Sequence, residues 1–194
     1  MTGLNRRTVK SIGHIMAPEE VADMLESLPP SRGRALAAFL TVATCRIGEA
    51  CHTKSKEKGV KRSQFVFDVE PGFVLIKDFA VEKKLVGLRI REEVALPLGG
   101  PFGRLTAIFL EYFNSTSGEW VFPFCIKSGY NYVVEETPKW PHYYRAVGEN
   151  TWLTLFRGDA MRAAKYLNIE VGSMANYIKS DWRNFSPYIL AGSP

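Results

Sequence analysis

The sequence predicts an α+β fold that is mostly helical and carries one small three-stranded antiparallel sheet. Three observations lead to this prediction. Apolar residues recur at helical spacing in segments towards both ends of the chain. Between these segments lies one block of strand-like runs that is bounded by turn residues. Pairs of proline and glycine divide the chain into short elements, and no internal repeat is present.

The first expected helix runs from Pro18 to about Leu28, because its apolar residues form one stripe. That stripe consists of Val21, Met24, Leu25 and Leu28. Two prolines end this helix, and a second helix is expected from about Ser31 to Cys45. The inward residues of the second helix are expected to be Leu36, Phe39, Leu40 and Ala43. A third helix is expected to begin near Gly48.

The sheet is expected to follow the third helix. Its three strands are predicted at Phe65–Val69, from Phe73 to about Lys83, and at Leu88–Leu98. The turns between them are expected at Pro71-Gly72 and Val86-Gly87. Because consecutive strands are joined by short turns, the sheet should be antiparallel.

Helical patterns return after the sheet. A helix is expected over Arg104–Phe113, followed by a polar turn. A short apolar segment at residues 120–124 then leads into what reads as a loop rich in tyrosine and proline. Three further helices are expected at His142–Phe156, at Asp159–Leu167, and at about Val171–Lys179. Residues 1–16 read as a basic arm or linker, residues 17–194 as one domain, and about 178–194 as its tail.

Composition narrows the class of protein. The chain has 194 residues, of which 46% are hydrophobic, so one domain is the first expectation and two small ones are possible. Cys45, Cys51 and Cys125 are too few for a disulfide framework and match no zinc spacing, which favours an intracellular, cytoplasmic protein. No stretch approaches the roughly 18 apolar residues of a membrane span. The net charge of +5 suits a polyanionic partner such as DNA, although a merely basic protein would show the same charge.

Arg46 is the first candidate site residue, since it lies where the second apolar helix ends. A guanidinium can hold two phosphate oxygens at once, which a lysine cannot do. Glu49 is three residues further on and can reach Arg46 from the next turn to orient it. A plain surface ion pair at this spacing is the alternative interpretation.

His142 and Arg145 form the second candidate pair and open the helix expected at His142–Phe156. Their spacing places them on one helix face, and the start of a helix favours an anion. A histidine can also transfer a proton near neutral pH. The alternative is a packed or capping histidine beside a solvent-facing arginine.

Tyr177 is the candidate nucleophile, and it competes with seven other tyrosines among the eight of the chain. A tyrosine must lose a proton whose unperturbed pKa is near 10 before it can attack. Two arginines beside it would assist this ionisation and neutralise a pentacoordinate phosphorus. The alternative is a core tyrosine whose hydroxyl has a hydrogen-bond partner.

Together, Arg46, Glu49, the His142-x-x-Arg145 box and Tyr177 resemble the active site of the tyrosine recombinases, the phage integrase family. Thr44-Cys45-Arg46-Ile47-Gly48-Glu49 is similar to the family's first box, although Thr44 stands where a glycine is usual. The strand at residues 91–98 looks like the family's third strand. The resemblance covers about residues 17–180 and implies the integrase-like catalytic fold.

The resemblance also implies a catalytic lysine near the turn between the second and third strands. Lys83 is favoured there by alternation from Phe79, Lys84 is a close second, and Lys77 is a distant third. Asn168 stands where the family carries histidine or tryptophan. An amide can donate a hydrogen bond to a phosphate oxygen but cannot transfer a proton.

The implied activity is DNA strand transfer through a 3′-phosphotyrosine, with no metal, ATP or other cofactor. The implied partner is double-stranded DNA, on which a tetramer assembles from chains that can be monomers in solution. The implied setting is a mobile element or virus in a prokaryotic or viral host cell. Family members usually carry a helical domain before the catalytic one, so the chain reads as a catalytic fragment or a minimal recombinase.

Three alternatives to this activity remain open. A type IB topoisomerase shares the same chemistry. A recombinase-fold DNA-binding accessory protein would keep the fold and lose cleavage. A metal-dependent nuclease is the third alternative, and sensitivity to EDTA would reveal it.

Overall fold

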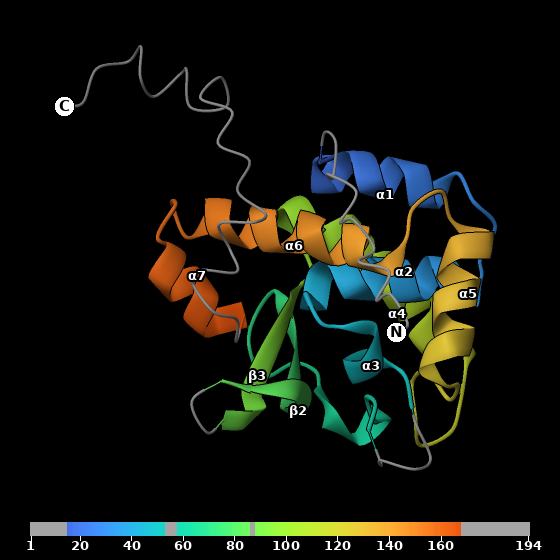
Figure 1. Ribbon diagram of the computed structural model, residues 1–194, viewed down its shortest axis with the longest axis horizontal. Helices are drawn as coiled ribbons and strands as arrows, with labels where there is room; N and C mark the ends of the chain where they lie inside the picture. The colour runs from blue at the N-terminus through green and yellow to red at the C-terminus, as the bar shows by residue number, and fades with distance from the viewer. Residues whose placement is uncertain (1–14, 53–57, 86–87, 168–194) are drawn as a thin grey trace, which may run out of the picture.

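The computed structural model describes residues 15–52, 58–85 and 88–167, with the side chains of residues 81–90 excepted. Within these residues the chain is rich in α-helix and carries one three-stranded antiparallel sheet in the order β1-β2-β3. Figure 1 shows the helices gathered above the sheet, with α7 beside the sheet at the left. The α+β class and the position of the sheet after the third helix are as the sequence predicts.

The helix α2 (Arg32–Ala43) is the centre of the helical layer. It packs against α4 (Gly103–Ser115), α5 (Ile126–Glu136) and α6 (Pro141–Leu155). All its residues from Gly33 to Ala43 are buried, because neighbours surround it on every side. The four inward residues expected for this helix are all fully buried.

The remaining helices flank this centre. The helix α1 (Pro18–Glu26) packs on α4 and α2, and α3 (Ile47–Ala50) is a single turn that follows α2. The helix α7 (Ala160–Leu167) folds back from the end of α6. Two short 3₁₀ turns, η1 (Arg62–Gln64) and η2 (Gly100–Phe102), precede β1 and α4.

The core is strongly aromatic. The rings of Phe39 and Phe109 lie 4.8 Å apart between centroids, and Phe39 and Phe122 lie 5.5 Å apart. Each ring buries a large apolar area, and tilted pairs at this separation add to that burial. The cluster joins α2 and α4 to the segment before α5, and it fixes the helical layer on which the sheet rests.

The sheet is formed by β1 (Phe65–Val66), β2 (Phe73–Leu85) and β3 (Leu88–Pro97). Its register pairs Lys77 with Glu93 and Phe79 with Arg91. The first strand was predicted to reach Val69 but ends at Val66, and the backbone enters the left-handed region soon afterwards, at Asp68 (φ 59°).

The loop predicted after residue 124 is wrong, since the structure places α5 (Ile126–Glu136) there. The segment is rich in aromatic and β-branched residues and contains a glycine, so its local helix propensity is low. Gly129 lets the helix pack closely, because a Cβ there would lie 2.6 Å from the Cys51 sulfur. Packing on α2 and α3 decides the conformation here, not propensity. The helix predicted near Val171–Lys179 and residues 1–14 of the predicted N-terminal arm (1–16) lie outside the described residues.

Candidate functional site

The turn between α2 and α3 delivers Arg46. Helix α2 ends at Ala43, and its C-cap residue Thr44 adopts the left-handed conformation (φ 50°, ψ 38°). A β-branched residue is strained there, because its Cβ crowds the backbone at positive φ. The chain then passes through the fully buried Cys45 to Arg46, which is the N-cap of α3.

Arg46 and Glu49 contact each other in the manner expected from their spacing. The Arg46 backbone N donates to Glu49 Oε2 at 2.6 Å, and Arg46 Nη1 donates to Oε1 at 3.2 Å. The Glu49 side chain is 5% exposed and that of Arg46 is 31% exposed. Glu49 is therefore a buried anchor that holds a partly accessible guanidinium, which is a different arrangement from a solvated surface pair.

His142 and Arg145 lie in the first two turns of α6, which begins at Pro141. Arg145 is buried (6% exposed), so the alternative of a solvent-facing arginine is wrong. Its Nε donates to Glu149 Oε1 at 2.8 Å, and Glu149 is 1% exposed. His142 is exposed and lies three residues before Arg145 on the same helix.

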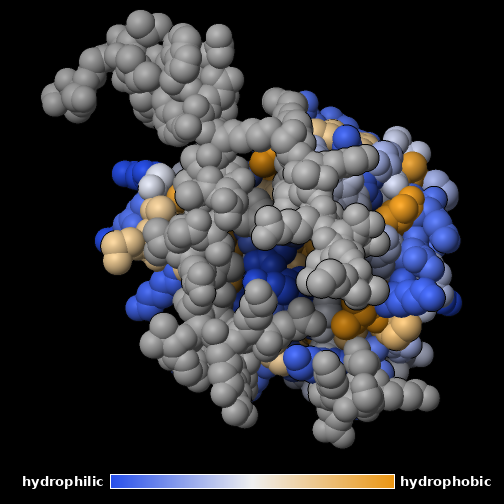
Figure 2. Space-filling view, in the orientation of Figure 1, coloured by the Kyte–Doolittle hydropathy of each residue, from blue (hydrophilic) through white to orange (hydrophobic). Residues whose placement is uncertain are grey.

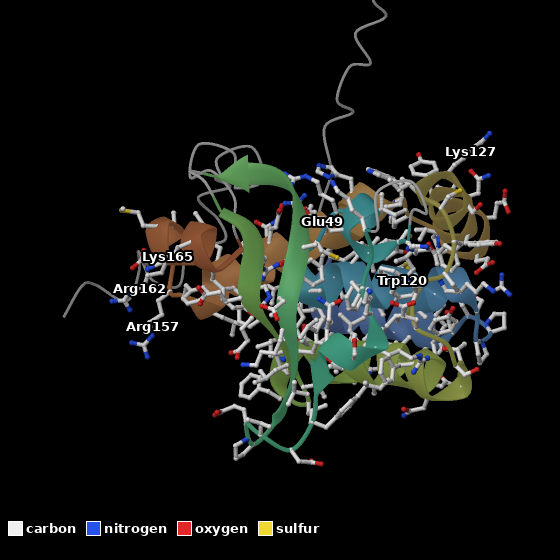
Figure 3. The ribbon with its side chains drawn as sticks, turned by 90° about the horizontal axis from the view of Figure 1, so that it is seen from below. Glu49, Trp120, Lys127, Arg157, Arg162 and Lys165 are labelled. Atoms are coloured by element: carbon white, nitrogen blue, oxygen red, sulfur yellow. The ribbon has the colours of Figure 1, made fainter. Side chains whose placement is uncertain are left out.

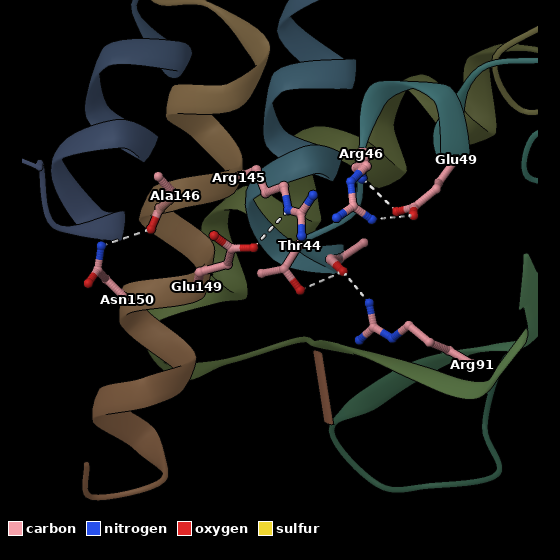
Figure 4. Close-up of polar contacts among 9 residues, drawn as sticks. Thr44, Arg46, Glu49, Arg91, Arg145, Ala146, Glu149 and Asn150 are labelled. Carbon is pink, nitrogen blue, oxygen red and sulfur yellow. Dashed lines mark hydrogen bonds and ion pairs between the residues drawn. The ribbon is translucent and has the colours of Figure 1, made fainter. Parts of the chain in front are cut away.

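The structure brings Arg46, His142 and Arg145 into one cluster, although they are far apart in the chain. The pKa of His142 lies below its ordinary value, first because of burial of the ring and then because of the positive charges of Arg145 and Arg46. Both arginines also act on Glu149. Figure 4 shows Arg46 and Arg145 pointing into the same region from α3 and α6.

Helix α6 reaches this region because it crosses α2 at a glycine, so that no side chain separates the two backbones. A Cβ on Gly148 would lie 1.9 Å from the carbonyl oxygen of Thr41 and 2.5 Å from the Thr44 methyl group. Only a glycine permits this approach. The contact places Arg145 and Glu149, on either side of Gly148, next to the turn that carries Arg46.

Burial controls the ionisation of the acidic groups in the cluster. The pKa of Glu149 is raised by burial more than Arg145 lowers it. Its second oxygen, Oε2, has no hydrogen-bond partner among the described residues. Burial likewise raises the pKa of the Cys45 thiol, so this cysteine remains a neutral packing residue beside Arg46.

Sequence reasoning missed two residues of the cluster, Glu149 and Arg91. Glu149 could have been found, because it stands at i+4 from Arg145, where side chains of opposite charge meet on a helix. Arg91 lies on β3 and is 6% exposed, and its Nη1 donates to the Ala43 carbonyl oxygen at 2.9 Å. An arginine on a strand is usually exposed, so no local pattern indicates its burial.

The candidate lysines are placed only in part. Lys83 and Lys84 lie on β2, and their side chains belong to the portion that is not described. The pairing of β2 with β3 is irregular between Ala80 and Leu85, so the alternation that favoured Lys83 does not extend that far. The choice between Lys83 and Lys84 therefore stays open. Lys77 is bound to Glu93, its cross-strand partner.

Tyr177 and Asn168 lie outside the described residues. Helix α7 ends at Leu167, and its Tyr166 packs over Arg91, so the described chain ends beside the site.

The surface around the cluster is polar. Figure 2 shows hydrophilic residues at the centre of the face on which Figure 1 places the end of α2. A second basic group, made up of Arg157, Arg162 and Lys165, lies at the outer edge of α7, and Figure 3 shows it well away from Glu49. Among the described residues no helix is long and apolar enough to cross a membrane, and no three metal-ligating side chains gather.

The cluster can hold a tetrahedral anion. Arg46 and Arg145 supply planar guanidinium donors from two elements. Each guanidinium is bound by its own carboxylate, Glu49 or Glu149, which fixes its orientation. His142, whose pKa is lowered first by burial of the ring and then by the two positive charges, can donate or accept a hydrogen bond.

Comparison with known proteins adds no relative. No protein-family model matches the chain, and no curated protein or solved structure matches it.

Proposed function

We propose that the chain is the catalytic domain of a tyrosine recombinase, a DNA strand transferase that cleaves and rejoins duplex DNA through a 3′-phosphotyrosine. One observation carries the proposal. Arg46, His142 and Arg145, selected from the sequence as site residues, come from two different helices, and both arginines act electrostatically on His142. A structural ion-pair network is the ordinary explanation of such a cluster, but here a buried arginine and a partly exposed one converge with an exposed histidine.

In the proposed reaction Arg46 and Arg145 bind the non-bridging oxygens of one DNA phosphate. The Tyr177 phenolate oxygen forms a bond to phosphorus while the bond to the 5′-oxygen breaks. Lys83 or Lys84 gives its proton to that leaving oxygen. His142 assists as a hydrogen-bond donor or as an acid and base, and Asn168 donates one hydrogen bond.

The second step reverses the first on a new strand. A free 5′-hydroxyl attacks the phosphotyrosine, its proton returns to the lysine, and Tyr177 leaves as the phenolate. The covalent link conserves the energy of the phosphodiester, so the reaction requires neither ATP nor a metal ion. Assembly of a tetramer on DNA inside a prokaryotic or virus-infected cell belongs to the same proposal.

A second candidate function is a recombinase-fold protein that binds DNA without cutting it. The buried carboxylate of Glu149 favours this candidate, because it already occupies one donor of Arg145 and reduces the positive charge available to a phosphate. Asn168 favours it as well, since an amide cannot replace the proton transfer of a histidine.

Because the target sequence is unknown, the test uses a library of randomised duplexes that carry a nick. The protein is incubated with the library in EDTA and the reaction is stopped in detergent. DNA linked to protein is then recovered and sequenced, and mass spectrometry locates the linkage. Wild type should yield DNA attached at Tyr177, and Tyr177→Phe should yield none.

The other outcomes discriminate between the candidates. Binding of the library without any adduct selects the accessory protein. Cleavage that requires a divalent metal and leaves no adduct selects a nuclease. An adduct that persists in Tyr177→Phe removes this tyrosine from the proposed mechanism.

A further inference from the structure

Arg91 is a buried arginine that the proposed reaction does not use. It lies on β3 opposite Phe79, and only 6% of it is exposed. Burial lowers its pKa, which means that the surroundings disfavour its charge. Arginine is rarely buried without a partner, so its position needs a reason.

Arg91 Nη1 donates its hydrogen bond to a backbone carbonyl at the C-terminal end of α2. The Ala43 carbonyl oxygen accepts from Arg91 Nη1 at 2.9 Å and from Thr44 Oγ1 at 2.7 Å. The last carbonyls of a helix lack partners within the helix, and a cation is favourable there. Trp152 Nε1 donates to the neighbouring Val42 carbonyl at 3.3 Å, so side chains from β3 and α6 both cap α2.

The capped carbonyl belongs to the residue at which the Arg46 turn begins. Thr44 follows in the left-handed conformation, and Arg46 comes two residues later. Such a strained turn persists only where its surroundings hold it. The Arg91 guanidinium ties this turn to the sheet, as Figure 4 shows.

Two nitrogens of the Arg91 guanidinium, Nε and Nη2, have no hydrogen-bond partner among the described residues, and no carboxylate there forms an ion pair with the guanidinium. Its centre lies 5.3 Å from the ring of Tyr166 on α7. Because unsatisfied buried donors are costly, we regard this arrangement as retained for the site and not for stability alone.

We infer that Arg91 is a positioning residue of the proposed phosphate site: it fixes the Thr44–Arg46 turn through the Ala43 carbonyl, so that Arg46 faces the scissile phosphate. The inference rests on the proposed function. Arg91 acts on Arg46 through the backbone and does not itself touch the DNA.

Arg62 provides a matched control. Its Nη2 donates to the Phe113 carbonyl oxygen at 2.6 Å, its guanidinium lies 4.2 Å from the Phe113 ring, and its Nε also lacks a partner among the described residues. It therefore shares the chemistry of Arg91, but it caps α4 instead of α2. Arg91→Met and Arg91→Lys are compared with Arg62→Met and Arg62→Lys.

The first measurement is the rate of adduct formation in a single turnover, on a target recovered from the library. At saturating DNA, Arg91→Met should be about 10- to 100-fold slower than Arg62→Met, while the DNA concentration for half-maximal rate stays similar. Arg91→Lys keeps one donor and should recover part of the rate. Equal rates in the Arg91 and Arg62 variants would overturn the inference. If Arg91→Met does not fold, the comparison of Arg91→Lys with Arg62→Lys decides in the same way.

The second measurement does not depend on the reaction. Hydrogen exchange followed by mass spectrometry should show faster exchange of the amides at residues 44–51 in Arg91→Met than in Arg62→Met, at matched global stability. Unchanged exchange there would refute the positioning role. If wild type forms no adduct with any duplex, the proposed function fails, and the exchange result still decides whether Arg91 holds the turn.

Discussion

Arg145 and Glu149 form a buried ion pair one turn apart on α6, with Arg145 Nε 2.8 Å from Glu149 Oε1. Gly148 lies between them and brings the pair against the end of α2. This relationship makes the centre of the cluster both charged and enclosed, and several measurable properties follow from it.

The first prediction concerns Glu149 and pH. Because burial raises its pKa in the folded protein above the ordinary value of 4.5, the folded state binds this proton more tightly than the unfolded chain does. The resulting stabilisation is fully present below the ordinary pKa and is lost as pH rises through the raised one. In urea unfolding, the free energy of unfolding of wild type should therefore fall relative to that of Glu149→Gln as the pH rises. If it instead rises relative to the variant, the prediction is wrong.

The second prediction concerns the neighbours of His142. Since the charges of Arg145 and Arg46 lower its pKa after burial does, Arg46→Met should raise that pKa towards the ordinary 6.5. An NMR titration of the imidazole signals measures it. The chain has three histidines, and a His142→Gln spectrum assigns the signal. A pKa that falls or stays constant in Arg46→Met would show that the two side chains are not close.

The third prediction tests the approach of α6 to α2. Gly148→Ala should lower the free energy of unfolding by about 1–3 kcal/mol or more, because its Cβ would overlap the Thr41 carbonyl. Gly99→Ala is the control, since nothing lies within 4 Å of a Cβ there and its φ of −145° suits alanine. Denaturant midpoints provide the measurement, and equal stability of the two variants would refute the close crossing.

The fourth prediction concerns the planar donors. Arg46→Lys and Arg145→Lys keep the charge but lose the two-pronged geometry, and each should slow adduct formation by about 100-fold or more. Arg62→Lys, whose guanidinium binds the end of α4 and not the cluster, should keep the wild-type rate. If the lysine variant at either position cleaves at the wild-type rate, the arginine at that position does not hold the phosphate through two parallel hydrogen bonds.

The fifth prediction concerns the thiols. Cys125 is exposed and its pKa is lowered, chiefly by its hydrogen bond to Ser128, whereas burial raises the pKa of Cys51 to about 12 and that of Cys45 well above its ordinary value. Iodoacetamide should therefore modify Cys125 in the native protein and the other two only after unfolding. Peptide mapping reads this directly. Native alkylation of Cys45 would mean that the turn before Arg46 is open.

Local spacing carried much of the prediction from sequence. Arg46 with Glu49 could be recognised because contacts three residues apart follow from helical geometry alone. The same is true of the apolar face of α2 and of the antiparallel strands, whose connections are short. The same helical spacing could have identified Glu149, four residues after Arg145, but the prediction from sequence did not include it.

Other features depended on contacts between distant segments. Helix α5 forms against its own propensities, because Gly129 and Val133 pack into the helical layer. The irregular pairing after Ala80 breaks the alternation on which the choice between Lys83 and Lys84 depended. A bulge of this kind has no reliable mark in a single sequence.

The sequence by itself determined the α+β class, the three antiparallel strands after the third helix, the described helices other than α5, and the residue types suited to a phosphate. The tertiary structure alone decided that Arg46 and Arg145 share one region, and that Arg91 is buried against the end of α2. The physical reason is range. Periodicity and capping act over a few residues, whereas burial of a charge depends on the helix crossing at Gly148 and on the register that sets Arg91 opposite Phe79.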